Sequence, residues 1–344
     1  MLSCCKEEKM KKLVCLIFLL SGCASPELCR EGRIYFMEGK WEDAYHAFST
    51  CLEKYPENAE LYRLRGLASF RMERYEDAVR DIEKAIEINP DRSIYYVDLA
   101  KIYHAKGERE VCLQYYTKAI EKEPQNHDFY EWRAMVYFEM GEYRKAAEDL
   151  TLALRYSVVK MPLRCKRMRM YALAGMLDEA IKETRELWEF FGEKAQLHGE
   201  LAFLYFWKGE CDSAVFHFTR AIEEGGSPDL YFWRGLVYYF MGETENALGD
   251  VNQGREKAGS GIQKTFFNAL YALIKKDHVQ AVKEFDYLIE NMPSVGDFYY
   301  LRGEAYRLMG KSEEAEKDWE KAHFFNNNYP LRWRKGLDKE NIKE

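Results

Sequence analysis

A sequence pattern returns every 34 residues along most of this 344-residue chain. Its clearest marker is one position per repeat that holds alanine in eight of nine copies. The marker positions are Ala44, Ala78, Cys112, Ala146, Ala180, Ala214, Ala247, Ala281 and Ala315. The spacing is 34 at every step except between Ala214 and Ala247, where it is 33. A fixed period of this length predicts stacked copies of one supersecondary unit.

Two more columns of small residues accompany the marker. The first lies twelve residues before it and comprises Gly32, Gly66, Ala100, Ala134, Met168, Ala202, Gly235, Ala269 and Gly303. The second lies seven residues after it and comprises Cys51, Ala85, Ala119, Ala153, Leu187, Ala221, Gly254, Leu288 and Ala322. Two antiparallel helices approach closely only where their facing side chains are small. We therefore expect each repeat to hold two helices of about 14 residues.

Glycine and proline mark where these helices end. Glycine falls between the two helices of most repeats, at positions 39, 107, 141, 175, 209, 242 and 310. Proline follows the second helix at positions 56, 90, 124 and 293. Glycine favours a left-handed backbone that ends a helix, and proline prevents its continuation. With only eight prolines and few turn clusters, the composition favours an all-α fold.

This column pattern resembles the tetratricopeptide repeat. The resemblance implies an α-solenoid, a right-handed superhelix of about nine helix-turn-helix units. We expect units one to four in residues 25–160, units five to seven in 161–261 and units eight and nine in 262–329. Residues 330–344 would form a polar capping helix and a tail. Three glycines, at positions 254, 259 and 261, predict a loosened contact between units seven and eight, with a plain loop as the alternative.

The N-terminal stretch KKLVCLIFLLSGC has a basic start and an uncharged run that is too short to span a bilayer. Its last four residues, Leu20 to Cys23, resemble the lipobox of bacterial lipoproteins. The resemblance implies that residues 1–22 are a signal peptide and that Cys23 is lipidated. The chain would then be anchored in the bacterial cell envelope, and Ala24 after the cysteine favours the outer membrane. The alternative is a soluble protein with an apolar N-terminus.

The chain contains none of the motifs of common catalytic sites. A search for H-E-x-x-H, G-x-S-x-G, the P-loop and a strand-linked G-x-G-x-x-G finds no match. The seven histidines are expected to fall in different units, without paired ligand spacing. The net charge of −7 argues against general nucleic-acid binding. We therefore expect no enzymatic activity, no cofactor, no metal and no nucleic-acid partner.

Stacked helical repeats present a concave groove lined by the first helix of each unit. In the resembled family, positions 2, 5, 9, 12 and 13 of the unit face this groove. Here units six to eight place Phe203, Phe206, Trp207, Phe232, Leu236, Tyr239, Phe240, Phe266, Leu270 and Leu273 at such positions. These residues either bind a protein or peptide partner, or they form the core between tightly wound units.

The sequence thus predicts a non-catalytic adaptor lipoprotein whose groove binds a protein or peptide. The alternative is a glycan- or peptidoglycan-binding protein that stacks sugars on Trp207, Trp233 and Tyr239. Partner identity and oligomeric state stay open.

Two smaller features also allow alternatives. Arg164, Lys166, Arg167 and Arg169 form a basic run that either binds an anion or is a solvated helix face. Cys29 and Cys51 fall on the two helices of unit one, where an exported protein can join them in a disulfide. The spacing alone leaves both questions open.

Overall fold

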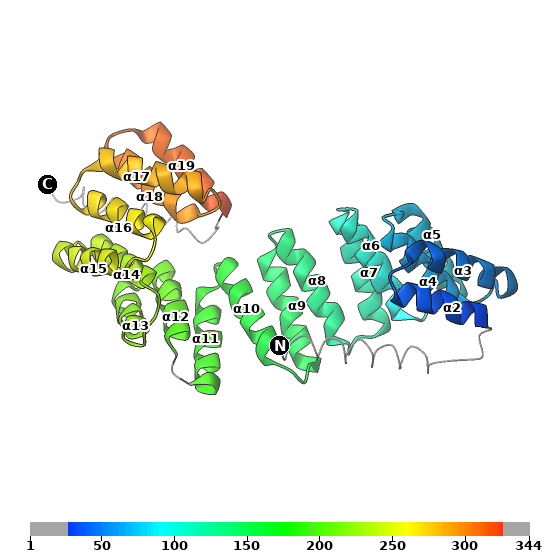
Figure 1. Ribbon diagram of the computed structural model, residues 1–344. Helices are drawn as coiled ribbons and strands as arrows, with labels where there is room; N and C mark the ends of the chain where they lie inside the picture. The colour runs from blue at the N-terminus through cyan, green and yellow to red at the C-terminus, as the bar shows by residue number, and fades with distance from the viewer. Residues whose placement is uncertain (1–26, 193, 326–344) are drawn as a thin grey trace. The chain divides into compact units, whose positions relative to one another are not determined.

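The computed structural model describes residues 27–192 and 194–325, and this part of the chain contains eighteen helices and no strand. Short turns join the helices two by two in chain order, which gives nine helix-turn-helix units and confirms the all-α prediction (Figure 1). Their bounds are α2 (Glu27–Met37), α3 (Trp41–Lys54), α4 (Ala59–Arg71), α5 (Tyr75–Ile88), α6 (Ser93–Ala105), α7 (Arg109–Lys122), α8 (His127–Glu139), α9 (Tyr143–Tyr156), α10 (Met161–Leu173), α11 (Leu177–Phe191), α12 (Ala195–Lys208), α13 (Cys211–Glu223), α14 (Asp229–Phe240), α15 (Thr244–Lys257), α16 (Gly261–Ile274), α17 (His278–Asn291), α18 (Gly296–Leu308) and α19 (Ser312–Phe325).

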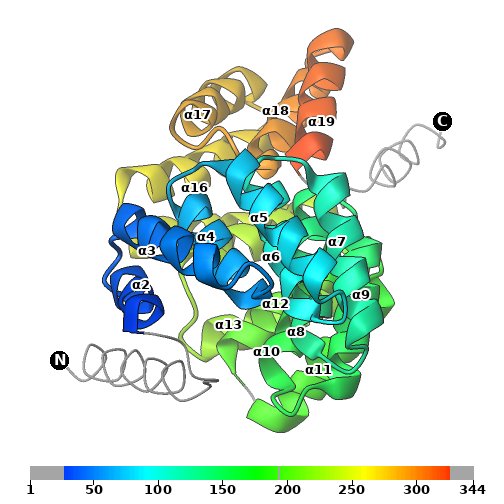
Figure 2. The same cartoon turned by 90° about the vertical axis from the view of Figure 1, so that its right-hand side faces the viewer.

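The chain divides into two compact units. The first unit holds α2 to α8 together with residues 155–157, and the second holds residues 141–154 and α10 to α19. Each unit has its own core, with Phe48 and Ile82 fully buried in the first and Phe218 and Phe285 in the second. Within the first unit, α4, α5, α6 and α7 lie side by side in chain order (Figure 2). The segment bounds 25–160, 161–261 and 262–329 stay predictions.

The sequence positions that hold small residues in each repeat lie where the two helices of a hairpin touch. All nine marker residues are buried. A Cβ atom on Gly32 would lie 2.8 Å from Cε1 of Phe48, and one on Gly303 would lie 2.7 Å from Nε1 of Trp319. At these two positions a large aromatic ring of the second helix rests directly on the backbone of the first, which requires a glycine there. Met168, the bulky exception in this column, is only half-buried.

An arginine on the first helix joins three helices in several hairpins. Arg234 on α14 donates to both carboxylate oxygens of Asp250 on α15, at 2.9 and 2.6 Å, and to Thr219 on α13 at 2.8 Å. Two other arginines bind in the same way to residues sixteen positions after and before them. Arg65 donates to Asp81 and Ser49, and Arg302 donates to Asp318 and Asp286. Since the arginine bonds its own hairpin and the preceding one, it fixes how consecutive hairpins stack.

Gly254 contradicts the predicted loosening between units seven and eight. Helix α15 continues through Gly254 to Lys257, and the glycine is buried. A Cβ atom here would lie 2.1 Å from Cε1 of Phe267 on α16. The missing side chain thus permits a close contact between the two hairpins, because the Phe267 ring packs directly on the α15 backbone.

Several sequence predictions lie outside the described residues. These are the signal peptide 1–22, the lipidated Cys23 and the segment 330–344. Among the helices that the structure describes, none has both the length and the apolar character that crossing a bilayer requires.

Candidate functional site

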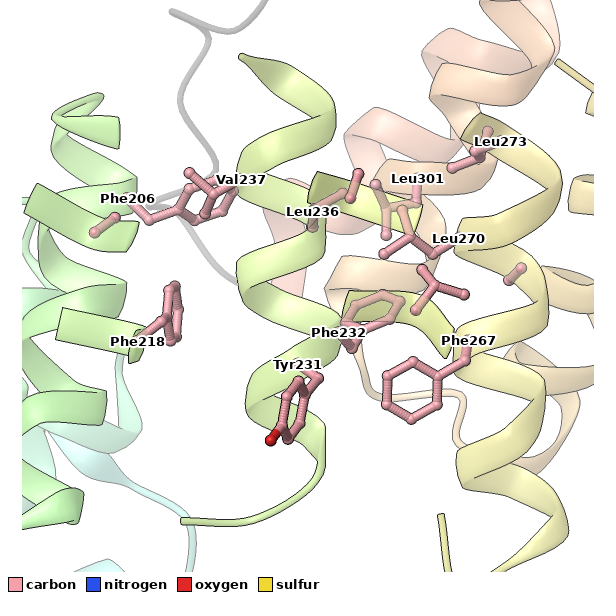
Figure 3. Close-up of a cluster of buried hydrophobic side chains, with 14 of the residues drawn as sticks. Phe206, Phe218, Tyr231, Phe232, Leu236, Val237, Phe267, Leu270, Leu273 and Leu301 are labelled. Carbon is pink, nitrogen blue, oxygen red and sulfur yellow. The ribbon is translucent and has the colours of Figure 1, made fainter. Parts of the chain in front are cut away.

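The aromatic residues of the second unit divide into core residues and partly exposed residues. Phe206, Phe232, Leu236 and Leu270 are buried, with exposed fractions of 7, 2, 3 and 0%. Figure 3 shows the last three in one cluster between α14 and α16. Leu273, also named for the groove, is 1% exposed. For these residues the expectation of a partner-binding groove is corrected in favour of the core.

The physical reason for this correction is the close packing of consecutive first helices. In the second unit α14 contacts α16 directly and not only through α15. At Gly235 a Cβ atom would lie 3.2 Å from Cβ of Asp250 on α15 and 3.5 Å from Cδ2 of Leu270 on α16, so this position of α14 lies against both helices. Residues on the facing sides of α14 and α16 are therefore enclosed between the two helices.

The other five named aromatic residues are half-buried: Phe203, Trp207, Tyr239, Phe240 and Phe266. Phe203, Trp207 and Phe266 belong to a row of ring contacts that crosses the first helices of four successive hairpins. Phe203 on α12 contacts Trp233 on α14 with ring centroids 5.1 Å apart, and Phe266 on α16 contacts Phe298 on α18 at the same distance. Phe232 links the two pairs, at 5.3 Å from Trp233 and 6.0 Å from Phe266. We call this set, with Trp207 beside Phe203 at 6.1 Å, the aromatic row.

The residues named for glycan stacking lie within or beside this row. Trp233 meets Phe203 and Phe232 edge to face, at interplanar angles of 78° and 86°. Tyr239 packs beside Phe240, with centroids 5.4 Å apart. Trp233 is therefore already held by two aromatic neighbours, whereas Trp207 contacts one ring of the row, Phe203.

The basic run on α10 is partly neutralised by the neighbouring helix α11. Arg164 donates to Glu186 at 2.6 Å, and Arg167 donates to Glu183 and to Thr151. Glu183 is buried beneath them. Lys166 and Arg169 are exposed. The interpretation as a four-residue anion patch is therefore corrected for Arg164 and Arg167, which already serve as ion-pair partners inside the unit.

In the first unit, charged residues on successive first helices contact one another. Arg63 on α4 donates from Nε to Asp98 on α6 at 2.5 Å and from Nη1 to Glu60 at 3.1 Å. Burial raises the pKa of the Asp98 carboxyl, and the Arg63 guanidinium opposes that effect. One repeat later, Nε2 of His104 lies 2.7 Å from Glu139 on α8. These contacts join consecutive hairpins on the side lined by first helices.

A cavity of about 1050 Å³ opens on this side of the first unit. Helices α2, α4 and α6 contribute Arg33, Arg63 and Tyr95 to its lining. Lys54 at the end of α3 also lines it, together with the loops that connect α3 to α4 and α5 to α6, the second of which contributes Arg92. Sequence reasoning did not predict this cavity, because the two loops lie 34 residues apart and meet only in the stacked structure.

Cys29 on α2 and Cys51 on α3 are joined by a disulfide, with Cα atoms 5.7 Å apart. The structure thus selects one of the two possibilities that the sequence left open. Among the described residues, Cys112, Cys165 and Cys211 are free thiols. Burial raises the pKa of the Cys112 thiol to about 12, so this sulfur is not a reactive thiolate near neutral pH.

The expectation that the histidines fall in different units is wrong for one pair. His198 and His217 belong to the same hairpin, and their Nδ1 atoms lie 2.9 Å apart in the interior of the second unit. In the described part of the chain, one group of three potential metal ligands also occurs, His127, Asp128 and Glu131 on α8. These three groups lie at the surface of one helix turn, where such clusters are common without an ion.

Three comparisons with known proteins agree with this architecture. Models of the tetratricopeptide repeat match residues 29–93, 94–126, 115–148 and 296–322. The Hsp70-Hsp90 organizing protein of Triticum aestivum is 33% identical over 78 residues, which is 23% of this chain. The match spans only 13% of that relative's length.

Two solved structures were similar to this chain at low sequence identity. The apo form of RapI superposes with a TM-score of 0.54 at 15% identity, covering 91% of this chain and 98% of RapI. A tetratricopeptide repeat protein from Parabacteroides merdae gives a TM-score of 0.44 at 19% identity, covering 71% of this chain and 98% of the other. The likeness to RapI is a likeness of fold alone.

Proposed function

Because this chain is a tetratricopeptide-repeat protein, we propose that it is a non-catalytic scaffold that holds a protein or peptide partner against the first helices of its hairpins at the bacterial cell envelope. The repeats imply protein interaction in general terms. More specifically, we propose that the aromatic row is the binding surface and that a lipid attached to Cys23 anchors the chain in the membrane.

The aromatic row is the observation that carries the proposal. Phe203, Trp207 and Phe266 are apolar and half-buried. Phe203 and Phe266 contact rings on other hairpins, and Trp207 contacts Phe203 on its own helix. A ring that is fixed before binding loses little conformational entropy when a partner covers it. Aromatic anchors contribute about 2 to 4 kcal/mol each when a partner buries them fully.

The location rests on two separate features. The stretch Leu20 to Cys23 has the order of small residues and cysteine that precedes lipid attachment in bacterial lipoproteins. The Cys29–Cys51 disulfide supports export, because disulfides persist in oxidising compartments such as the periplasm and are rare in the cytosol. Both features favour an envelope protein.

Partner capture from membranes tests the proposed binding surface. Wild-type protein and the double variant Phe203→Ala/Trp207→Ala would be affinity-purified from solubilised membranes, and co-purifying proteins quantified by mass spectrometry. We expect at least tenfold less of a specific partner with the variant. The matched control is Phe216→Ala, which removes a 56% exposed ring from the second helix α13. If every protein enriched by the wild type is enriched equally by the double variant, the aromatic row is not the binding surface.

Lipid labelling tests the anchor independently. Cells that produce the wild type, Cys23→Ser or Cys165→Ser would be fed radioactive palmitate and fractionated. Cys165 is an exposed thiol and so controls for labelling of accessible cysteines. We expect Cys23→Ser to lose both the label and membrane association, while Cys165→Ser keeps both. Equal labelling of Cys23→Ser and the wild type would contradict the lipid anchor.

A further inference from the structure

We infer that His198 and His217 form a pH-sensitive latch, which holds α12 against α13 at neutral pH and releases it in acid. The two helices are the two halves of one hairpin, and α12 carries Phe203 and Trp207 of the aromatic row. Acidification therefore loosens one end of the proposed binding surface. For this consequence the inference rests on the proposed function, whereas the latch itself does not depend on it.

Both histidine rings lie in the interior of the hairpin, with exposed fractions of 1% for His198 and 8% for His217. Their Nδ1 atoms are 2.9 Å apart, which is the distance of a hydrogen bond between the two rings. Such a bond holds one hydrogen atom, because one Nδ1 donates it and the other accepts it. The pair thus stays bonded when both rings are neutral, and also when one ring is positively charged.

Protonation of the second ring breaks this bond. An imidazolium carries a hydrogen atom on each nitrogen, so with two charged rings neither Nδ1 atom can accept. Tyr205 of α12 stacks on His217, and Trp188 of α11 packs against both rings, so the two charges face each other among aromatic side chains that screen them weakly. Since His198 belongs to α12 and His217 to α13, the repulsion acts directly on the contact between these helices.

The charged groups around the pair differ between its two rings. Glu224, the residue after α13, lies 3.6 Å from Nε2 of His198. Burial, the neighbouring His198 and Arg185 on α11 lower the pKa of His217 from 6.5 to about 4. From α14, Arg234 reaches α13 two residues beyond His217, and a carboxylate of α15 balances its charge. A carboxylate thus faces one ring and a guanidinium the other, so the pair takes up its second proton only in acid.

The contact between α12 and α13 supports the aromatic row. Phe203 on α12 lies edge to face against Phe218 of α13, with ring centroids 5.2 Å apart. Phe218 is fully buried in the core of the second unit. When the helices separate, Phe203 loses this support, and its contacts with Trp207 and Trp233 change with it. The row is therefore intact near neutral pH and disrupted in acid.

The free thiols of the chain report the opening of the latch. Cys211 is the first residue of α13 and is half-buried against the core of the second unit. Cys165 is exposed, and Cys112 is buried in the first unit. The purified full chain would be treated with 4,4′-dithiodipyridine at pH 7 and pH 4, and peptide mass spectrometry would identify the labelled residues. We expect the labelling rate of Cys211, divided by that of Cys165, to rise at least fivefold in acid while Cys112 stays unlabelled.

The variant His217→Gln removes the second proton but keeps a hydrogen-bond partner, because the amide oxygen accepts from a charged His198. We expect its ratio of Cys211 to Cys165 labelling to change less than twofold between pH 7 and pH 4. The matched control His46→Gln changes an exposed histidine and should keep the wild-type response. If His217→Gln loses helicity at pH 7, His198→Gln/His217→Gln decides instead, since two amides bond each other and neither takes up a proton.

Fluorine NMR follows the aromatic row without any binding partner. The chain would be labelled with 5-fluorotryptophan, and Trp207→Phe would identify the resonance of Trp207. We expect this resonance to shift between pH 7 and pH 4 in the wild type and to keep its position in His217→Gln. Because no partner takes part, a failure of the latch is distinguishable from a failure of the aromatic row as a binding surface.

Three results would overturn the inference. These are an unchanged labelling ratio for Cys211 in the wild type, an equal rise in His217→Gln, and a Trp207 resonance that does not shift when Cys211 becomes accessible. Loss of helicity at pH 4 in both the wild type and His217→Gln would also contradict it, because groups other than the histidine pair would then determine the response to acid.

Discussion

Glu73 occupies the same turn position as Gly107 one repeat later, and both residues have a left-handed backbone, with φ of +60° and +80°. Lys276 is the second non-glycine residue in this conformation, with φ of +59°. The equivalent turn position in each of the other hairpins is glycine with a positive φ. The left-handed backbone is therefore common to all nine of these turns, including the two that lack glycine.

Replacing Glu73 by glycine should stabilise the protein. A non-glycine residue with left-handed backbone dihedrals carries a cost of roughly 1 to 2 kcal/mol, part of which glycine recovers. We expect Glu73→Gly to raise the free energy of unfolding by about 0.5 to 1 kcal/mol in urea denaturation. The reverse change, Gly107→Ala, should lower it by about 1 kcal/mol, since no heavy atom lies within 4 Å of the added Cβ and only φ opposes it. A lower free energy of unfolding for Glu73→Gly, or a higher one for Gly107→Ala, would disprove this reading of the turn.

His217 should make stability depend on pH below neutrality. Burial, His198 and Arg185 lower its pKa from 6.5 to about 4. Tyr205 stacks on the ring from α12, Trp188 packs from α11, and Glu224 lies 3.6 Å from Nε2 of His198. The unfolded chain therefore binds a proton at a higher pH than the folded chain does.

The sign of the effect follows directly. Above pH 6.5 both states are neutral at His217 and the residue adds no pH dependence. Between pH 6.5 and 4 only the unfolded state is protonated at His217. The free energy of unfolding therefore decreases as the pH is lowered through this range, by about 2 kcal/mol after allowance for solvent screening. Urea denaturation at pH 7 and 4.5 measures this difference. His217→Gln should lose this share of the pH dependence, whereas His46→Gln, which changes an exposed histidine, should retain it.

The helix order could be predicted from the sequence because each hairpin repeats the contacts that determine it. Ala78 and Ala214 lie where helices touch in the structure, as the spacing predicts. The division between core and binding surface could not be predicted. Whether Leu270 is buried depends on how closely α14 approaches α16, and this distance is set between hairpins rather than within one.

Two kinds of interaction join residues on different helices, so the spacing of residues within one helix does not predict them. The arginine bridges join residues sixteen apart, such as Arg234 and Asp250, on two different helices. His198 and His217 are nineteen apart and meet across a turn. Aligning the repeats by the marker alanine places each arginine just before the small column and each aspartate three residues after the marker, which identifies the bridges.

Removal of one partner from an arginine bridge should destabilise the second unit strongly. Asp250→Asn leaves the half-buried Arg234 guanidinium without its carboxylate, and we expect a loss of about 3 kcal/mol in the free energy of unfolding. The double variant Arg234→Leu/Asp250→Leu should lose less free energy of unfolding than Asp250→Asn does, because it leaves no charge unpaired. The third hairpin already has Leu99 and Tyr115 at these positions. Asp212→Asn, at an exposed position, is the control. A double variant that is less stable than Asp250→Asn would contradict the argument.

Two glycines on α15 should respond in opposite ways to the same substitution. In Gly254→Ala the new methyl group would lie 2.1 Å from the Phe267 ring, so the hairpins must separate, and we expect a loss of about 1 to 3 kcal/mol. Gly249 lies on the same helix with no heavy atom within 4 Å of an added Cβ. Gly249→Ala should therefore gain roughly 0.5 to 1 kcal/mol, from the helix propensity of alanine.

In Gly254→Ala/Phe267→Leu the smaller side chain makes room for the methyl group, so the double variant should lose less than the sum of its two single changes. Thermal and urea unfolding of the wild type, Gly254→Ala, Phe267→Leu and the double variant measure this coupling, with Gly249→Ala beside them. Strict additivity would show that the Gly254 backbone and the Phe267 ring do not press against each other.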